Sequence, residues 1–111
     1  MVANRIVPLE VDEVRVTTVV DNSIDLLLVS DAVAQRYPTS SKWLPIVSAL
    51  PNPIGRDHPV AEYGFSALIN VSRGDSSSTV LFDTGVSQRG LLHNIDALDI
   101  DLKDIQALIL S

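Results

Sequence analysis

The stretch TVLFDTGVSQRGLLHNIDAL, residues 79–98, changes its hydrophobic period midway and so predicts a strand, a turn and a helix in succession. Residues 79–83 are expected to form a strand, since 79–82 are apolar or β-branched and Asp83 ends the run. Gly85 permits the unusual backbone angles of a tight turn, and Ser87 is a residue type that favours a helix N-cap. Apolar residues then recur at about 100° per residue, which predicts an amphipathic helix. They are Leu91, Leu92, Ile95 and Leu98.

A β-hairpin is expected to include the first part of this stretch. In residues 65–71, FSALINV, alternate side chains share a face, which is typical of a strand. Residues 72–78, SRGDSSS, are small and polar and predict a turn. Residues 79–83 then form the second strand of the hairpin.

The N-terminal half contributes one strand and a proline-rich segment. Residues 14–20, VRVTTVV, are mostly β-branched, and Val14, Val16 and Val20 are expected on one face of a strand. The following IDLLLV continues this strand or forms a short helix. Residues 37–60 hold five of the six prolines, which excludes a continuous helix or central strand and predicts a variable loop.

The C-terminal residues complete an expected α/β (α+β) domain covering residues 1–111. Asp101 is expected to cap a short turn, and residues 105–111, IQALILS, form an apolar strand. The order is therefore strand, Pro-rich loop, β-hairpin, helix and strand. An apolar edge strand invites aggregation, so the chain resembles a truncated domain that would self-associate or require a partner.

Composition places the chain among soluble, cytoplasmic proteins. Apolar residues make up 46% and charged residues 20% of the 111 residues, which favours a folded domain. The net charge of −6 offers no attraction to nucleic acid or to an anionic membrane. The absence of cysteine excludes disulfides and thiolate metal sites. We therefore expect neither a nucleic acid nor a membrane as partner.

The triplet Asp83-Thr84-Gly85 allows more than one interpretation. After an apolar strand it matches the half-site of an aspartic protease, in which two carboxylates from a homodimer share a proton. The segment after Gly85 predicts helix, turn and strand, whereas those proteases need a flap hairpin there. The favoured interpretation is that Asp83 is structural and accepts backbone hydrogen bonds from the turn that follows.

Neither histidine shows the spacing of a metal site. His58 lies in the Pro-rich segment, and His93 falls on the polar side of the predicted helix. Zinc sites need several ligands converging at short, characteristic spacings. We therefore predict surface histidines and no specific zinc site in this chain.

Three segments together resemble a known family. VTTVVDNSIDLLL (16–28), AEYGFSALINV (61–71) and TVLFDTGVSQRGLLHNIDALDIDLKDIQALILS (79–111) are similar to the N-terminal part of metallo-β-lactamase-fold hydrolases. The similarity is to the branch of the dihydropterin–ribofuranosylaminobenzene phosphate synthases. It implies the first half of an αββα sandwich, with Asp83 as the structural aspartate at the end of an early strand and Gly85 in its turn. The resemblance also implies that Asn22, Glu62 and Gly64 lie on the active-site side.

The resemblance also implies what is missing. After a strand like ALILS the family carries His-x-His-x-Asp-His, which begins a site for two zinc or similar divalent ions, and the sequence stops at Ser111 before it. Tyr63 stands where this branch commonly has His. No catalytic residue and no metal ligand is therefore carried over. We expect a catalytically incompetent N-terminal fragment of such a hydrolase. The alternatives are a structural or interaction module that pairs with a separate C-terminal half and, less favoured, the homodimeric aspartic protease.

Overall fold

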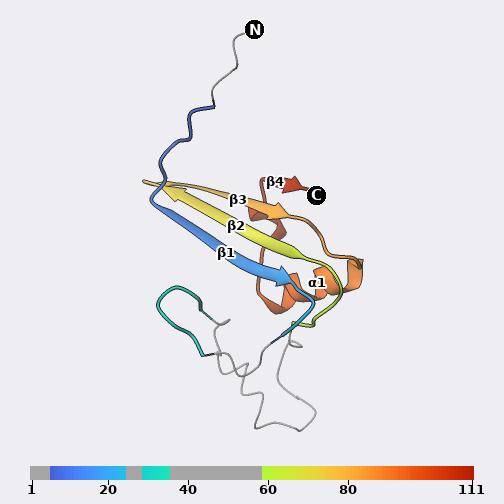
Figure 1. The fold of residues 1–111 in the computed structure, drawn as a ribbon. Coiled ribbons are helices and arrows are strands. Elements are labelled where there is room, and N and C mark those ends of the chain that lie inside the picture. Colours follow the sequence, from blue (N-terminus) through green and yellow to red (C-terminus); the bar gives the residue numbers. More distant parts are fainter. Residues whose placement is uncertain (1–5, 25–28, 36–58) are drawn as a thin grey trace.

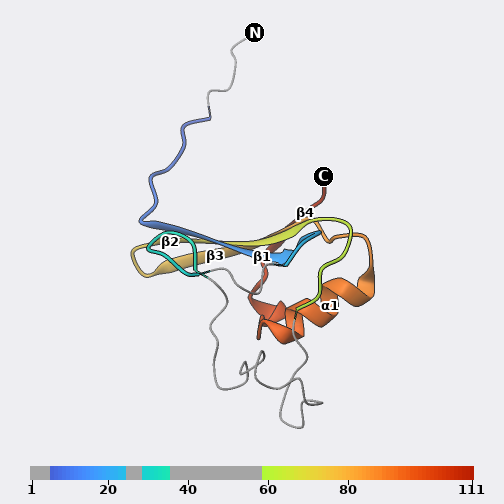
Figure 2. The same cartoon turned by 60° about the horizontal axis from the view of Figure 1, so that its bottom comes forward.

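The computed structural model describes residues 6–24, 29–35 and 59–111. In these residues a four-stranded sheet carries an α-helix on one face (Figures 1 and 2). The elements are β1 (Glu13–Val20), β2 (Ser66–Arg73), β3 (Ser76–Phe82), α1 (Gln88–Ala97), a 3₁₀ turn (Leu102–Asp104) and β4 (Ala107–Ile109). This confirms a mixed α+β fold. The Pro-rich segment, except for residues 59–60, and most of IDLLLV lie outside the described residues.

The strands follow each other across the sheet in sequence order, β1-β2-β3-β4. The first three are antiparallel, whereas β3 and β4 are parallel and pair Val80 with Ala107 and Phe82 with Ile109. A parallel pair cannot be joined by a tight turn, so the chain must cross over between them. The crossover contains α1 and the 3₁₀ turn, and it brings the carboxyl ends of β3 and β4 side by side (Figure 1).

The core lies between α1 and one face of the sheet. Val20 from β1 and Leu81 from β3 are buried against Ile95 of α1. Partly buried apolar residues surround this cluster: Leu68, Leu91, Leu98, Ile100 and Ile105. Ser87 caps α1 as expected, since its hydroxyl accepts a hydrogen bond from the Gly90 amide.

The opposite face of the sheet, here called the open face, is not covered by α1 (Figure 2). Directly paired residues share a face of a sheet, and the register places on the open face Val14, Val16, Ala67, Ile69, Val71, Val80, Phe82 and Ile109. Val14 and Val16 are 55% and 60% exposed. At its edge, the rings of Phe65 and Phe82 meet at 6.4 Å between centroids.

Val20 does not share a face with Val14 and Val16, contrary to the sequence prediction. The register shifts between Thr18 and Val20, so one extra residue enters β1 opposite β2. Such a bulge exchanges the faces of the residues that follow it. Val20 thereby turns into the helix-covered core, where it is fully buried.

The predicted seven-residue hairpin turn is also wrong. β2 continues to Arg73 and β3 begins at Ser76, which leaves a turn of Gly74 and Asp75 with φ of +54° at the glycine. Glycine at the first central position suits a two-residue hairpin turn. The small polar residues 76–78 are exposed but pair with β2, because backbone hydrogen bonding does not require an apolar side chain.

Candidate functional site

The predicted site residues gather at one end of the sheet, where the segments after β1, before β2, after β3 and after β4 meet (Figure 1). Asp83 lies at the centre of this group, directly after β3. Its amide donates a hydrogen bond to the carbonyl of Ile109 at 2.7 Å, and its carbonyl accepts one from the Ser66 hydroxyl at 2.8 Å. The backbone of Asp83 therefore ties β3 to the start of β2 and the end of β4.

The conformation of Asp83 is unusual and is stabilised by its own side chain. Its φ is +56°, in the left-handed region that few residues other than glycine adopt. The carboxylate accepts hydrogen bonds from the Thr84 amide at 2.8 Å and from the Ser111 hydroxyl. The bond from Ser111, and then the one from Thr84, hold the pKa of Asp83 below its ordinary value. The carboxylate thus links β3 to the chain that leaves β4.

Glu62 joins the same end of the sheet to the start of α1. Its amide donates to the carbonyl of Asp21, directly after β1, at 3.1 Å. Its carboxylate accepts hydrogen bonds from the amide of Ser87, at 3.1 Å, and from the Ser87 hydroxyl. These bonds lower the pKa of Glu62, the hydroxyl bond most strongly. Ser87 therefore caps the helix and binds Glu62 at once.

Two glycines allow the segment before β2 to pack against the loop after β3. A Cβ on Gly64 would lie 3.0 Å from both the Cα of Gly85 and the amide nitrogen of Val86. Gly64 and Gly85 also have positive φ angles of 128° and 69°. The Gly85 amide donates to the carbonyl of Phe65 at 2.9 Å. The resemblance placed Gly64 and Gly85 at the site, and the structure brings them into contact.

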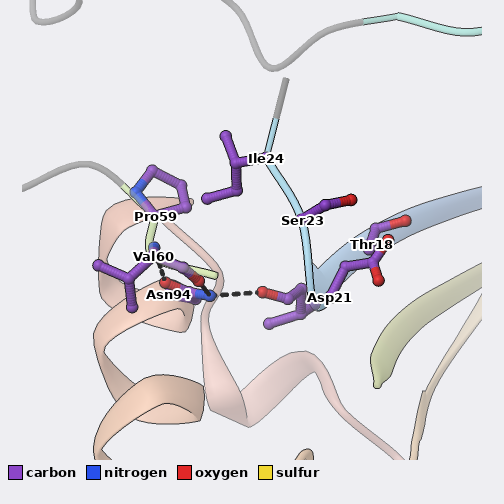
Figure 3. A pocket seen from close by; sticks show the side chains of 8 residues that line it. Thr18, Asp21, Ser23, Ile24, Pro59, Val60 and Asn94 are labelled. Atoms are coloured by element: carbon purple, nitrogen blue, oxygen red, sulfur yellow. Dashed lines mark hydrogen bonds between the residues drawn. The ribbon is translucent and has the colours of Figure 1, made fainter. Parts of the chain in front are cut away.

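Asn94 is a buried site residue that sequence reasoning missed. It lies on α1 and is 1% exposed. Its side-chain oxygen accepts from the Val60 amide at 2.8 Å, and its nitrogen donates to the carbonyls of Val19 and Val60 at 2.8 and 2.9 Å. Asn94 lines a pocket of about 230 Å³, seen from close by in Figure 3. The other lining residues are Thr18, Val19, Asp21, Ser23, Ile24, Pro59 and Val60. Asn94 lies beside the predicted apolar stripe rather than within it, so the helical period alone gave only a weak signal of its burial.

The remaining candidates lie apart from these contacts. Asn22 is exposed, and its amide donates to the Asp21 carboxylate at 2.7 Å. The Tyr63 side chain is 85% exposed. His93 is half-buried on α1, and His58 lies outside the described residues. The structure therefore unites Asp83, Glu62 and the two glycines but leaves Asn22 and Tyr63 at the surface.

The described residues do not form a set of metal ligands. Within 6–24, 29–35 and 59–111, no three His, Cys, Asp or Glu residues gather closely enough to hold an ion. Both carboxylate oxygens of Asp83 accept protein hydrogen bonds. We therefore derive no catalytic step through a metal from these residues. The hydrogen bonds of Asp83 and Glu62 position the backbone around the carboxyl ends of β3 and β4.

Comparison with known proteins adds no relative. No protein-family model, curated protein or solved structure matches this chain. In the part of the chain that the structure describes, no helix is long and apolar enough to cross a membrane.

Proposed function

We propose that this chain is the N-terminal part of a metallo-β-lactamase-fold, metal-dependent hydrolase similar to the dihydropterin–ribofuranosylaminobenzene phosphate synthase branch, and that it is catalytically incompetent alone. The observation that carries the proposal is the hydrogen bond from the Ser111 hydroxyl to the Asp83 carboxylate. It joins the carboxyl ends of two adjacent parallel strands, the edge at which α/β sheets commonly place their sites.

The position of Asp83 suits a structural role in such a site. In the family the His-x-His-x-Asp-His motif follows the strand that corresponds to β4. A segment leaving β4 passes Asp83, whose carboxylate already accepts a bond from Ser111 in that segment. Asp83 would therefore orient the backbone that carries the ligands without being a ligand. The metal ions, when bound, would supply an activated water for hydrolysis of an ester, amide or phosphoester.

The open face supports a role for a second half-domain. It presents exposed apolar side chains, among them Val14, Val16 and Ile109, each about half exposed. Burying one large apolar side chain contributes about 1.5–3 kcal/mol, so a second sheet placed there would add substantially to stability. The same surface suits the alternative of an interaction module that pairs with a separately encoded half. For the hydrolase fragment and for the interaction module alike, we propose the cytoplasmic location that the composition predicts.

The aspartic protease gains no support from these contacts. A catalytic dyad needs two carboxylates sharing a proton across a dimer axis. Here the carboxylate of Asp83 is bonded within its own chain to Thr84 and Ser111. Helix α1 starts five residues after Asp83, at Gln88, where a protease would build its flap.

The test begins with the gene. The DNA after codon 111 is translated in all frames, and the chain is expressed joined to any segment found there. We expect His-x-His-x-Asp-His within a few residues, about two bound zinc ions and hydrolysis of an activated ester or phosphodiester. Asp83→Asn should lower the zinc content, whereas Asp75→Asn, in the exposed hairpin turn, should not.

Two outcomes would overturn this proposal. If no frame encodes the motif, the fragment hypothesis is wrong and the interaction module is favoured. If the 111-residue chain cleaves peptides at acidic pH, and both pepstatin and Asp83→Asn abolish the cleavage, the chain is the homodimeric protease.

A further inference from the structure

The carboxylate of Glu62 occupies a space formed by glycine backbone. A Cβ on Gly85 would lie 2.9 Å from one of its oxygens, and a Cβ on Gly90 would lie 2.2 Å from the other. Any side chain at either position would therefore collide with the carboxylate. Gly90 is buried on α1 and Gly85 lies in the loop after β3, so Glu62 sits between the loop and the helix.

The bonds of Glu62 connect three segments that are distant in sequence. Its backbone is held to the end of β1 through Asp21, and its side chain holds Ser87, which lies 25 residues away. Ser87 ends the loop that begins at Asp83. Because Asp83 has a left-handed backbone, the loop needs constraints at both ends to maintain that conformation.

We propose that the ionised Glu62 carboxylate holds the loop 83–87 in place through its hydrogen bonds to Ser87, a link here called the clasp. The clasp positions Asp83 against the chain that leaves β4. Protonation of Glu62 releases the loop. Glu62 is thus a positioning residue that acts through Asp83. This inference rests on the proposed function for its biological meaning, because Asp83 is the residue that would orient the ligand-bearing segment.

The charge of Glu62 is what the clasp requires. An ionised carboxylate accepts two hydrogen bonds from Ser87, whereas a protonated one has an O–H that needs an acceptor in the same space. The amino end of a helix also favours a negative charge. The bonds to Ser87 hold the pKa of Glu62 below its ordinary value, so the clasp is closed at neutral pH and opens only as the pH falls through that lowered pKa.

Other charged groups lie on the segments that pack against Glu62. They are Asp21 after β1, Asp83 on the loop and Arg89 on the first turn of α1. Among the described residues, the structure records no salt bridge between Glu62 and Arg89. The carboxylates of Asp21 and Asp83 each accept a hydrogen bond from the next residue in their own segment. The bonds to Ser87 are therefore the main link between the ionised Glu62 and the loop.

Amide NMR of the 111-residue chain tests the clasp directly. The Ser87 and Gly90 amides should titrate together with a midpoint below that of an ordinary glutamate, and Glu62→Gln should abolish this titration. At neutral pH, Glu62→Gln should speed hydrogen exchange at the Ser87 amide roughly tenfold, as expected when a charged acceptor is lost. Exchange at the Gly90 amide should also speed up, because its acceptor is the Ser87 hydroxyl that Glu62 holds in place. Glu10→Gln, at an exposed position of the N-terminal arm, is the matched control and should change neither quantity.

Further variants separate the clasp from general damage to the fold. Ser87→Thr keeps the hydroxyl and should keep the titration, whereas Ser87→Ala should move its midpoint upward. Unchanged exchange in Glu62→Gln, or a Ser87 titration that persists in that variant, would overturn the proposal. These measurements need no metal and no activity, so a failed clasp leaves the hydrolase proposal standing, and a failed hydrolase proposal leaves the clasp intact.

Discussion

Replacing Asn94 by alanine should destabilise the chain more than any surface substitution. The change removes three hydrogen bonds. The carbonyls of Val19 and Val60 and the amide of Val60 each lose their Asn94 partner. A buried polar group without a partner costs about 1–3 kcal/mol. The Val60 groups are only part-buried, so water replaces some of what they lose.

The expected magnitude is therefore about 3 kcal/mol in the free energy of unfolding. That is a large share of the roughly 5–15 kcal/mol that stabilises a small domain. Urea unfolding followed by circular dichroism measures it. With a slope of about 1.5 kcal/mol per molar urea, the midpoint should fall by about 2 M. Asn22→Ala makes the same chemical change at an exposed position and should shift stability by no more than about 0.5 kcal/mol.

Equal unfolding midpoints for the two alanine variants would refute this reasoning. They would mean that Asn94 makes no net contribution, and that the end of β1 and the segment before β2 are held to α1 by apolar packing alone. A changed slope in Asn94→Ala would instead indicate an altered denatured state or loss of two-state unfolding, and hydrogen exchange at Val60 would then decide the question.

Three further outcomes are expected. Gly85→Ala should destabilise the chain more than Gly74→Ala, and thermal unfolding measures the difference. Both glycines have left-handed backbone angles, which cost alanine about 1–2 kcal/mol. A Cβ at Gly85 would in addition lie 2.9 and 3.0 Å from neighbouring atoms, whereas a Cβ at Gly74 would face open space. Because the Asp83 pKa is lowered, its contribution to stability is present above the ordinary aspartate pKa and lost as pH falls through the lowered value, so Asp83→Asn should flatten the dependence of urea midpoints on pH in acid. Val16→Lys on the open face should reduce concentration-dependent association in light scattering, whereas Val33→Lys, at a 95% exposed position outside the four strands, should not.

Local sequence determined the elements of this protein and their order. β-Branched residues predicted β1, the change to a helical period predicted α1, and the residue types at Ser87 and Asp101 predicted caps that the structure confirms. These features depend on backbone preference and on neighbours within one turn, so a single sequence carries them. The boundaries of the hairpin strands were harder to predict from the sequence, because the serines after Gly74 pair through their backbone without an apolar pattern.

Only the tertiary structure decided which residues meet. The bulge before Val20 follows from its pairing with β2, and it sends this valine to the core face although alternation predicted the other. Glu62 binds Ser87 across 25 residues, and Asn94 reaches the carbonyl of Val19 across 75. Their partners are backbone groups and a hydroxyl that nearly every segment offers. A local pattern cannot specify such a contact, because it exists only once β1, the segment before β2 and α1 have packed together.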